Sequence, residues 1–318
     1  MRSASVIVPS VEGGERLGRL LDTLEPGDGA QETIVVDNGS VAEAVSRECA
    51  ARPAVEVIRL ERNAGFSRAV NVAAGRAQGE ALVLVNDDCV CDPGFVAAIA
   101  GALDPGSAAV MAAGVMRDGR DPSLIDSAGM ELDRTLLVFD YLNGEPTSRL
   151  NASIPDPIGP SGAAAAFDRG AFLEAGGFDE RLFAYWEDVD LVLRLRRRGA
   201  RCALAPAALG THEHSATLGS GSAAKNYLMG FGRGYVVRKW GVLRSPTRAA
   251  GVLARDAVLC AGQAIVDRNL AGLRGRVRGY RAALPTESYP ADAVSASAPG
   301  PLATLRRRAT RRARIRRG

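Results

Sequence analysis

The sequence predicts an α/β fold in which a largely parallel sheet is covered by helices on both faces. Two observations support this class. Short apolar runs rich in Val, Ile and Leu alternate with segments of helical periodicity through the first 115 residues. These runs are also apolar along their whole length, which is typical of strands that are buried on both faces of a parallel sheet.

Each element of this series has its own signal. The first strand, 5–8, ends at Pro9, and apolar residues at 17, 20, 21 and 24 give the next segment a helical spacing. Ligands bind beyond the carboxyl ends of the strands in such sheets. Polar clusters follow three of the predicted strands there: Asp37-Asn38, Arg62-Asn63 and Asn86-Asp87-Asp88. The predicted strands are 5–8, 33–36, 55–60, 81–85 and 109–115, and the predicted helices are 15–24, 41–51, 66–77 and 94–103.

The pattern changes after residue 115. Residues 117–160 are rich in Gly, Pro and Asp and are predicted to form loops, and a second ordered block starts at 162–167. Helix 188–198 closes at Gly199, a common helix stop, and strand 202–205 follows. The predicted division is a domain over 1–221, with halves 1–115 and 116–221, a helical region over 222–284, and a linker and Arg-rich tail over 285–318. Within the helical region, helices are predicted at 227–240 and 249–271.

Charge and composition exclude several classes. The formal net charge of the 318 residues is +4, but 306–317 holds eight arginines and no acid, so the remainder is mildly acidic. This is not the charge distribution of a nucleic-acid-binding fold, and only the tail is a candidate contact for anionic lipid, RNA or an acidic partner.

Targeting signals are weak. Five scattered cysteines without a Cys-x-x-Cys pair argue against a disulfide framework and favour the cytoplasm. The apolar stretch at the N-terminus is too short for a signal peptide, and no run was identified that approaches the ~20 apolar residues of a membrane span. The sequence therefore predicts a protein without a transmembrane segment.

The stretch LVLVNDDCVCDP, residues 82–93, predicts a metal site. Three polar residues, Asn86, Asp87 and Asp88, end an apolar strand, and hard cations such as Mg²⁺ and Mn²⁺ prefer oxygen ligands of this kind. Zinc would need about four ligands, and no second cysteine pair exists, so Cys89 and Cys91 are interpreted as small apolar residues. Asp92 before Pro93 has the pattern of a helix N-cap.

Two further clusters carry chemistry. Glu187 and Asp188 stand at a predicted helix start beside Phe183, Tyr185 and Trp186. A charged first turn explains the acids equally well in isolation, but apolar neighbours raise the pKa of a carboxylate and suit it to general-base catalysis. The only two histidines, His212 and His214, follow a strand together, and they are candidate metal ligands.

Other nucleotide-binding motifs are missing. The segment Arg62–Phe66 ends a strand and opens a helix, whose free N–H groups suit a phosphate. However, the chain has neither a G-x-G-x-x-G fingerprint nor a Walker lysine, and its two lysines are Lys225 and Lys239. Dinucleotide oxidoreductases and P-loop NTPases are therefore poorly supported.

Six motifs together resemble family-2 glycosyltransferases, in particular the bacterial rhamnosyltransferase-like branch. The resemblance covers about residues 4–240, in family order. It implies a GT-A fold, a Rossmann-like mixed sheet flanked by helices, with 1–115 as its nucleotide-binding half and 116–221 as its acceptor and catalytic half. The motifs are VIVPS (6–10), VVDNGS (35–40), RNAGFSRAVN (62–71), GEALVLVNDD (79–88), the long block 162–199 and H-x-H-S (212–215).

The resemblance also implies roles for single residues. Asp188 matches the catalytic base of the E-D motif, with Glu187 before it. Asp88 matches the metal ligand of the D-x-D position, and His212 matches the histidine that completes the site, with His214 as the alternative. The implied donor-binding residues are Pro9, Ser10, Asp37, Asn38, Ser40, Arg62, Asn63, Gly65, Asn71, Asn86 and Asp87, and Gly162, Trp186 and Asp190 are acceptor-side candidates.

Two departures from the family pattern stand out. The segment SVEGGERL follows Pro9, where the family commonly has an Asn or Tyr. The first acid of the D-x-D position is replaced by Asn86, a neutral ligand that would bind a cation less strongly.

The activity that the resemblance implies is inverting transfer of a sugar, with rhamnose favoured, from a nucleotide-diphosphate donor such as dTDP-rhamnose or a UDP-sugar. The acceptor would be a hydroxyl of a glycan or polyprenyl-linked saccharide in cell-wall or surface polysaccharide synthesis, and Mg²⁺ or Mn²⁺ would be the cofactor. The expected location is cytoplasmic, with peripheral membrane contact through the C-terminal helices and Arg tail. The alternatives are a sugar-nucleotidyltransferase and a non-catalytic nucleotide-sugar-binding domain.

Overall fold

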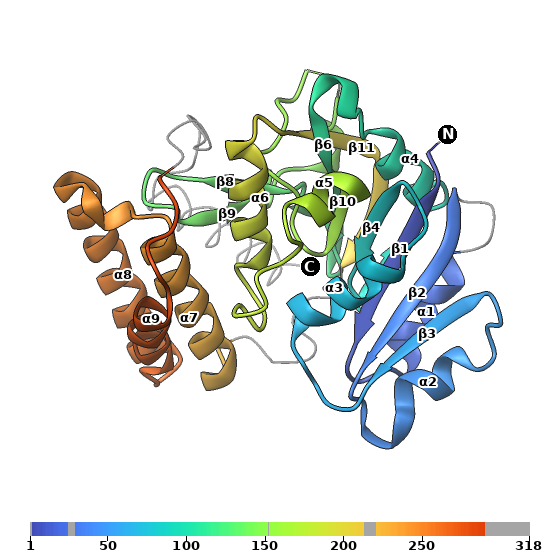
Figure 1. The fold of residues 1–318 in the computed structure, drawn as a ribbon, viewed down its shortest axis with the longest axis horizontal. Helices are drawn as coiled ribbons and strands as arrows, with labels where there is room; N and C mark the ends of the chain where they lie inside the picture. Colours follow the sequence, from blue (N-terminus) through green and yellow to red (C-terminus); the bar gives the residue numbers. More distant parts are fainter. Residues whose placement is uncertain (1, 25–28, 152, 213–220, 290–318) are drawn as a thin grey trace.

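A nine-stranded mixed sheet forms the centre of the molecule (Figure 1). The computed structural model describes residues 2–24, 29–151, 153–212 and 221–289. The first half of the chain contains β1 (Ala4–Ser10), α1 (Glu15–Thr23), β2 (Ala30–Asn38), α2 (Ala44–Cys49), β3 (Val55–Leu60), α3 (Phe66–Arg76), β4 (Ala81–Val85), β5 (Cys89–Cys91), α4 (Phe95–Gly101) and β6 (Ala109–Asp118).

The second half adds both strands and helices. It contains β7 (Asp121–Ser127), β8 (Met130–Leu132), β9 (Val138–Asp140), β10 (Ala164–Asp168), α5 (Arg169–Glu174), α6 (Glu187–Arg197), β11 (Arg201–His212), α7 (Ala223–Lys239), α8 (Pro246–Val266) and α9 (Ala271–Ala282). The strand order in the main sheet is β3-β2-β1-β4-β10-β6-β11-β5, with β7 paired to β6 and a separate β8–β9 ribbon.

The parallel part of the sheet aligns the polar clusters. Strand β1 pairs in parallel with β2 and β4, and β2 pairs in parallel with β3. Ser10 lies opposite Asp37, and Asp37 lies opposite Arg59, so the carboxyl ends of these strands share one edge. Strand β10 runs antiparallel between β4 and β6, which makes the whole sheet mixed rather than parallel.

Alternation along the strands divides the core between the two faces of the sheet. Ile7 of β1 belongs to a buried cluster with Val70 of α3 and Val192 of α6. Its neighbours Val6 and Val8 belong to a second cluster with residues of α1 and α4. Successive side chains of a strand point to opposite faces, so each face needs its own helical cover.

Several predicted boundaries were wrong. Residues 117–160 are not only loops, because β7, β8 and β9 lie there. The predicted helix 41–51 is divided into a 3₁₀ turn (Val41–Glu43) and α2, since Ala42 and Glu43 adopt left-handed backbone angles. Asp92 does not cap α4, which begins after Gly94; its carboxylate pairs with Arg117 of β6 instead.

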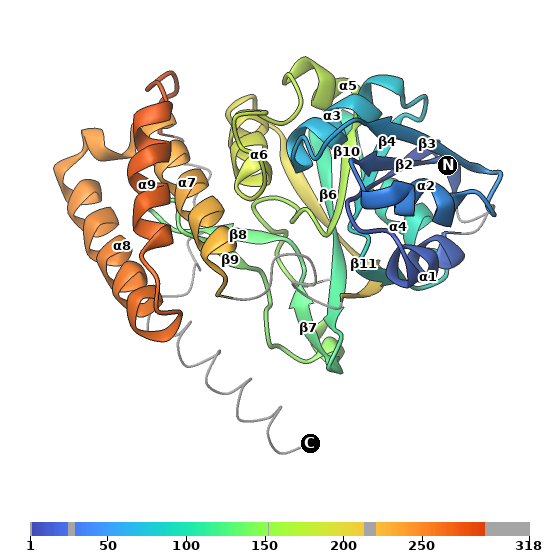
Figure 2. The ribbon, with the colours of Figure 1, turned by 90° about the horizontal axis from the view of Figure 1, so that it is seen from below.

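The C-terminal helices form a separate layer beside the sheet domain (Figures 1 and 2). Helices α7 and α9 approach closely through glycines. A Cβ atom on Gly234 would lie 2.1 Å from the carbonyl oxygen of Arg276, and one on Gly279 would lie 1.9 Å from that of Phe231. Only glycine permits this backbone contact, because a real Cβ atom does not approach backbone so closely.

Helix α8 is the outermost element in both views. It is the one helix of the described residues that is long and apolar enough to cross a membrane by length and composition, and only 6% of its apolar window is buried. The sequence prediction had not recognised an apolar segment of this length.

Candidate active site

The carboxyl ends of β1 and β4 meet through a short hydrogen bond. The Ser10 hydroxyl donates to Asp87 Oδ2 at 2.5 Å, and the Gly13 amide donates to Ser10 Oγ at 3.2 Å. Burial raises the pKa of Asp87 to about 6, although the Ser10 hydrogen bond opposes this shift. Pro9 precedes Ser10 in β1, opposite Val36.

At the carboxyl end of β2, the Asp37 carboxylate accepts hydrogen bonds from three groups of the protein. Asp37 is fully buried and accepts hydrogen bonds from the Ser40 amide at 2.8 Å, the Ser46 hydroxyl at 2.7 Å and Arg59 at 2.8 Å. Burial alone would raise the pKa of Asp37, but the hydrogen bonds from Ser40 and Ser46 and the Arg59 guanidinium hold it below its usual value. The Ser40 hydroxyl accepts a hydrogen bond from the Val45 amide.

Asn38 connects β2 to the loop after β3. Its Oδ1 accepts from the Ala64 amide at 2.8 Å, and its Nδ2 donates to Asn63 and to the carbonyl of Gly65. Gly39 faces the backbone of Arg62, where an added Cβ would lie only 2.3 Å from the carbonyl carbon. This packing brings two of the predicted polar clusters together at the sheet edge.

The loop before α6 rests on the start of α3. The Phe66 amide donates to the carbonyl of Phe183 at 2.7 Å, and the Ser67 hydroxyl donates to the carbonyl of Leu182. A Cβ on Gly65, whose φ is +90°, would lie 2.4 Å from the Phe183 oxygen. The glycine therefore allows the two segments to touch.

This loop ends in a strained backbone. Tyr185 and Trp186 have φ angles of 69° and 75°, which bulky side chains rarely adopt. Trp186 is buried and packs against α7, where a Cβ on Gly232 would lie 2.4 Å from its ring and Arg233 lies over the ring at 5.7 Å. Strain of this kind persists only where surrounding contacts hold it, and it concentrates at functional sites.

Two acids open α6 immediately after the strained pair. Asp188 is partly buried, its Oδ2 accepting from the Gly162 amide at 3.3 Å and its Oδ1 from the Val189 amide at 2.8 Å. Glu187 is buried, and its Oε2 has no hydrogen-bond partner among the described residues.

Burial raises the pKa of both carboxyls, and that of Glu187 well above its usual value, because the Asp188 charge adds to the burial. Backbone hydrogen bonds to Asp188 oppose its shift. Of the two carboxyls, Glu187 is therefore the one that holds a proton more readily.

A second acidic cluster lies where β4 and β11 end. Strand pairing sets His212 opposite Cys89, next to Asp88. His212 Nε2 lies 3.3 Å from Asp88 Oδ1, and Nδ1 lies 3.0 Å from Asp126 Oδ2. Burial lowers the pKa of His212, but hydrogen bonds with Asp126 and Asp88 outweigh this and raise it to about 9.

The donor set of this cluster fits a divalent cation. Ligand atoms of Asp88, Cys89 and His212 all lie within 4.8 Å of one another. Cys89 is buried in a core cluster with Val85 and Ala164, as expected of a small apolar residue, and burial raises the pKa of its thiol well above the usual value. Asp126 holds one ring nitrogen of His212 and leaves the other for a cation, the usual support of a metal-binding histidine.

Two residues near this cluster were not foreseen. Asp126 lies in β7, within the segment predicted to be loop, and a lone aspartate there gave no signal. Lys225, at the start of α7, has its ammonium 5.6 Å from the centre of the Tyr185 ring, and its pKa is lowered by burial against the opposing effect of Asp88 and Asp140. The C-terminal helices therefore add a positively charged side chain, Lys225, to the site.

Some predicted site residues have other surroundings. The Asn71 side chain forms two hydrogen bonds with the backbone of Phe178: Nδ2 donates to the carbonyl and Oδ1 accepts from the amide, at 2.9 Å each. Asp190 is fully buried and pairs with Arg194, Lys239 and Trp240, so it lies between α6 and α7 and not on an acceptor surface. His214 is outside the described residues. Arg62 is exposed, and the Asn86 carbonyl closes a turn to Cys89.

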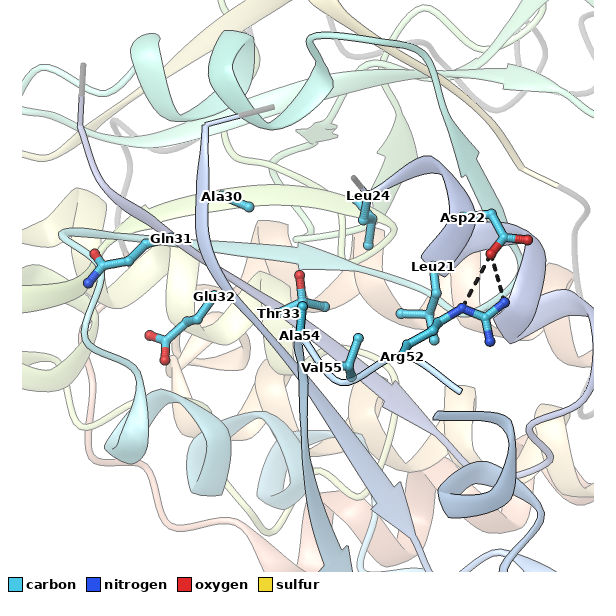
Figure 3. A pocket seen from close by; sticks show the side chains of 10 residues that line it. All are labelled: Leu21, Asp22, Leu24, Ala30, Gln31, Glu32, Thr33, Arg52, Ala54 and Val55. Carbon is cyan, nitrogen blue, oxygen red and sulfur yellow. Dashed lines mark hydrogen bonds and ion pairs between the residues drawn. The ribbon is translucent and has the colours of Figure 1, made fainter. Parts of the chain in front are cut away.

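A hollow of about 360 Å³ lies away from these residues (Figure 3). It is formed at the amino ends of β2 and β3 and includes Thr33, Val55 and the Asp22–Arg52 ion pair. Because β2 carries Asp37 and Asn38 at its other end, this hollow is separate from the candidate active site.

Comparison with known proteins agrees with the geometry. The sequence model of the family described as Glycosyl transferase family 2 matches residues 5–172, more than half of the chain. The chain belongs to glycosyltransferase family 2. This family-2 glycosyltransferase is 30% identical over 245 residues to an N-acetylglucosaminyl-diphospho-decaprenol L-rhamnosyltransferase of Mycobacterium tuberculosis, covering 67% of this chain and 77% of the relative.

Solved structures support the GT-A fold. GalNAc-T7 with UDP, GalNAc and Mn²⁺ aligns with a TM-score of 0.60 at 18% identity, over 76% of this chain and 48% of that one. The mannosyltransferase PcManGT from Pyrobaculum calidifontis, in complex with GDP-Man and Mn²⁺, aligns with a TM-score of 0.52 at 19% identity, over 98% and 79% of the two chains. The chain thus spans about half the length of GalNAc-T7.

Proposed function

We propose that this glycosyltransferase moves a sugar, with rhamnose favoured, from a nucleotide-diphosphate donor to a hydroxyl of a lipid-linked saccharide, with inversion at the anomeric carbon. The observation that carries the proposal is the pair of acidic clusters at the sheet edge: Asp188 beside Gly162, and Asp88 with His212 and Asp126. One suits a base, and the other suits a divalent cation.

Asp188 is the proposed base. Its carboxylate takes the proton of the acceptor hydroxyl, the oxygen forms a bond to the anomeric carbon, and the bond from that carbon to the diphosphate oxygen breaks. The nucleoside diphosphate leaves with the bonding electrons. Hydrogen bonds from Gly162 and Val189 hold the carboxylate in position, and the neutral Glu187 keeps a second negative charge away from it.

Asp88 and His212 would hold the divalent ion, and Asp126 would orient the histidine. A bound Mg²⁺ or Mn²⁺ supplies Lewis-acid stabilisation of the charge on the leaving diphosphate. Lys225 adds a cation on the same side, and its proximity to Asp88 suits it to a diphosphate contact. The Mn²⁺ in the two solved structures of similar fold supports a divalent ion as the cofactor.

The edge formed by Ser10, Asp37, Asn38 and Asn63 is proposed to bind the nucleoside. Asp37 is engaged by three groups of the protein, so its part is to hold the loop after β2, while Asn63 and Arg62 offer exposed polar groups. The mycobacterial relative, an N-acetylglucosaminyl-diphospho-decaprenol L-rhamnosyltransferase, supports rhamnose as the sugar and a polyprenyl-linked saccharide as the acceptor.

A donor panel tests this function. The purified chain is incubated with dTDP-rhamnose, UDP-sugars and GDP-mannose, with Mn²⁺, Mg²⁺ or chelator, and with a synthetic polyprenyl-diphosphate saccharide. The proposal expects metal-dependent release of a nucleoside diphosphate and a lengthened saccharide with one donor. Release of a nucleoside monophosphate, or no turnover with any donor, would contradict it.

A further inference from the structure

The outward face of α8 is apolar along its length. Between Ala250 and Val266, the exposed residues are all Ala, Leu, Val, Ile or Gly. Leu253, Val258 and Ile265 are 65%, 66% and 77% exposed. An outer helix of a water-soluble domain normally has its polar residues on this face, so α8 has the reverse arrangement.

Two of the three charged residues of α8, Arg255 and Asp256, are half-buried and form ion pairs with the rest of the domain, and the third, Arg248, lies over the ring of Tyr289 at 4.1 Å. Arg255 contacts Asp133 at 3.1 Å, and Asp256 contacts Arg233 at 3.1 Å and Arg276 of α9 at 3.6 Å. Gln263 donates to Asn226 of α7. These contacts attach α8 to the domain along one side. Spanning a bilayer would break them and carry Arg255 and Asp256 into hydrocarbon, so the helix is built to lie on a surface.

Helix α9 continues the apolar face and adds cations. Leu273, Val277 and Tyr280 follow one another at helical spacing and are 45%, 45% and 38% exposed. Arg274, Arg278 and Arg281 are exposed beside them, and no acid occurs between Arg268 and Arg281. With Phe231 of α7, these residues form a hollow of about 730 Å³ that has an apolar floor and an arginine rim.

The charge pattern indicates the occupant. A second copy associated through this face would bring no exposed acid to pair with the arginines of α9, because the one acid of α8, Asp256, is not exposed and α9 contains none. It would add only further arginines to the interface, which is unfavourable. An anionic bilayer satisfies both parts, because acyl chains accept the apolar face and phosphate headgroups accept the arginines.

We infer that α8 and α9 form a membrane-docking face on which the protein lies parallel to the surface of a bilayer rich in anionic phospholipid, with α8 in the interface and not across it. The inference goes beyond the proposed transfer reaction and does not depend on the donor sugar. It rests on the direction of the side chains of α8 and α9.

Vesicle sedimentation of the full chain tests the docking face. The probes are vesicles of phosphatidylcholine alone and of phosphatidylcholine with phosphatidylglycerol. We expect the wild-type chain to sediment with the anionic vesicles. The variant Leu253→Glu/Val258→Glu/Ile265→Glu should lose at least about tenfold in partitioning, and Arg274→Gln/Arg278→Gln/Arg281→Gln should lose its preference for anionic vesicles. Leu173→Glu, at an exposed leucine of α5, is the matched control and should bind like the wild type.

Four outcomes would overturn the inference. They are undiminished vesicle binding by the α8 variant, absence of binding by the wild type, a wild-type dimer that the α8 substitutions convert to a monomer without change in vesicle binding, and resistance of bound protein to alkaline carbonate extraction. Metal-dependent nucleoside diphosphate release on a water-soluble acceptor, measured on the same variants, should stay at the wild-type rate. A failure of docking is thereby distinguished from a failure of catalysis.

Discussion

His212 Nδ1 lies 3.0 Å from Asp126 Oδ2, while Nε2 of the same ring faces Asp88. The substitution Asp126→Asn removes the charged group that orients the ring, so we expect Mn²⁺ affinity to fall about 10- to 100-fold. Isothermal titration calorimetry with Mn²⁺ measures the effect. Asp121→Asn, at a half-buried position at the start of the same strand, is the control, and equal affinities for the two variants would refute the role of Asp126.

The contact between Gly65 and Phe183 gives a second prediction. In Gly65→Ala, the methyl group meets the Phe183 carbonyl in a left-handed backbone region, so the loop before α6 must move. We expect a loss of about 1–3 kcal/mol in the free energy of unfolding and a fall in kcat, because the loop leads to Asp188. Gly75→Ala, within α3, has no neighbour within 4 Å, so it should preserve kcat and should not lower the free energy of unfolding. A Gly65→Ala enzyme with normal kcat would show that the contact does not position the loop.

The buried ion pair between Lys239 and Asp190 links α6 to α7. Lys239 Nζ lies 2.9 Å from Asp190 and 2.9 Å from Asp179. Lys239→Met leaves the buried Asp190 and the half-buried Asp179 short of a partner, so we expect the free energy of unfolding to drop by about 3 kcal/mol. Urea denaturation measures it, with Arg68→Met, at an exposed ion pair, as a control expected to lose less than about 1 kcal/mol. A loss as small as that of the control would indicate that α6 does not depend on this link.

Asp37 predicts a pH dependence of stability. Its pKa is lower in the folded chain than the ordinary value of 3.8, so its contribution is present in full above that value and is lost as the pH falls through the folded pKa. The free energy of unfolding of the wild type should therefore fall as the pH drops below about 3.8. The free energy of unfolding of Asp37→Asn should fall less over the same range. Urea unfolding at pH 7 and pH 3 compares them. An equal loss of stability in the two proteins between pH 7 and pH 3 would show that folding does not lower the pKa of Asp37.

Replacing the carboxyl group by an amide is expected to affect activity differently at Glu187 and at Asp188. Because burial raises the pKa of Glu187 well above its usual value, we expect this carboxyl to be protonated in the active enzyme, and Glu187→Gln should keep kcat within a few-fold of the wild type. The acid limb of kcat/KM should report Asp188: activity falls as the pH drops through its pKa, which burial raises above 3.8. Loss of activity in a folded Glu187→Gln enzyme would contradict a protonated Glu187 and indicate that its carboxylate is needed for catalysis.

The local signals in the sequence predicted the parallel part of the fold well. Alternating apolar strands and helices located β1 to β4 and α3 within a few residues, and polar residues at strand ends predicted which side chains would meet. Strand β10 could not be foreseen as an antiparallel insertion, since pairing direction depends on contacts between distant segments. For the same reason β7 and Asp126 were missed: the segment has no periodicity of its own, and β6 gives it its strand conformation.

The C-terminal helices show a different limit. Their helical periodicity can be seen in the sequence, but the face of α8 that packs inward cannot be predicted from it. The charged residues of that face find partners only once α7, α9 and the β8–β9 turn are assembled. Asp190 likewise resembled a third acid of the active site in sequence. Burial and Lys239, 49 residues further along the chain, give it a packing role.

The most direct test of the account is Asp188→Asn. Donor and Mn²⁺ affinities are measured by calorimetry, and transfer is measured by product formation under the same conditions. Removing only the base should leave both affinities within about twofold of wild type and lower turnover at least about 10²-fold. Near-normal turnover by the Asp188→Asn enzyme would contradict the assignment of Asp188 as the catalytic base.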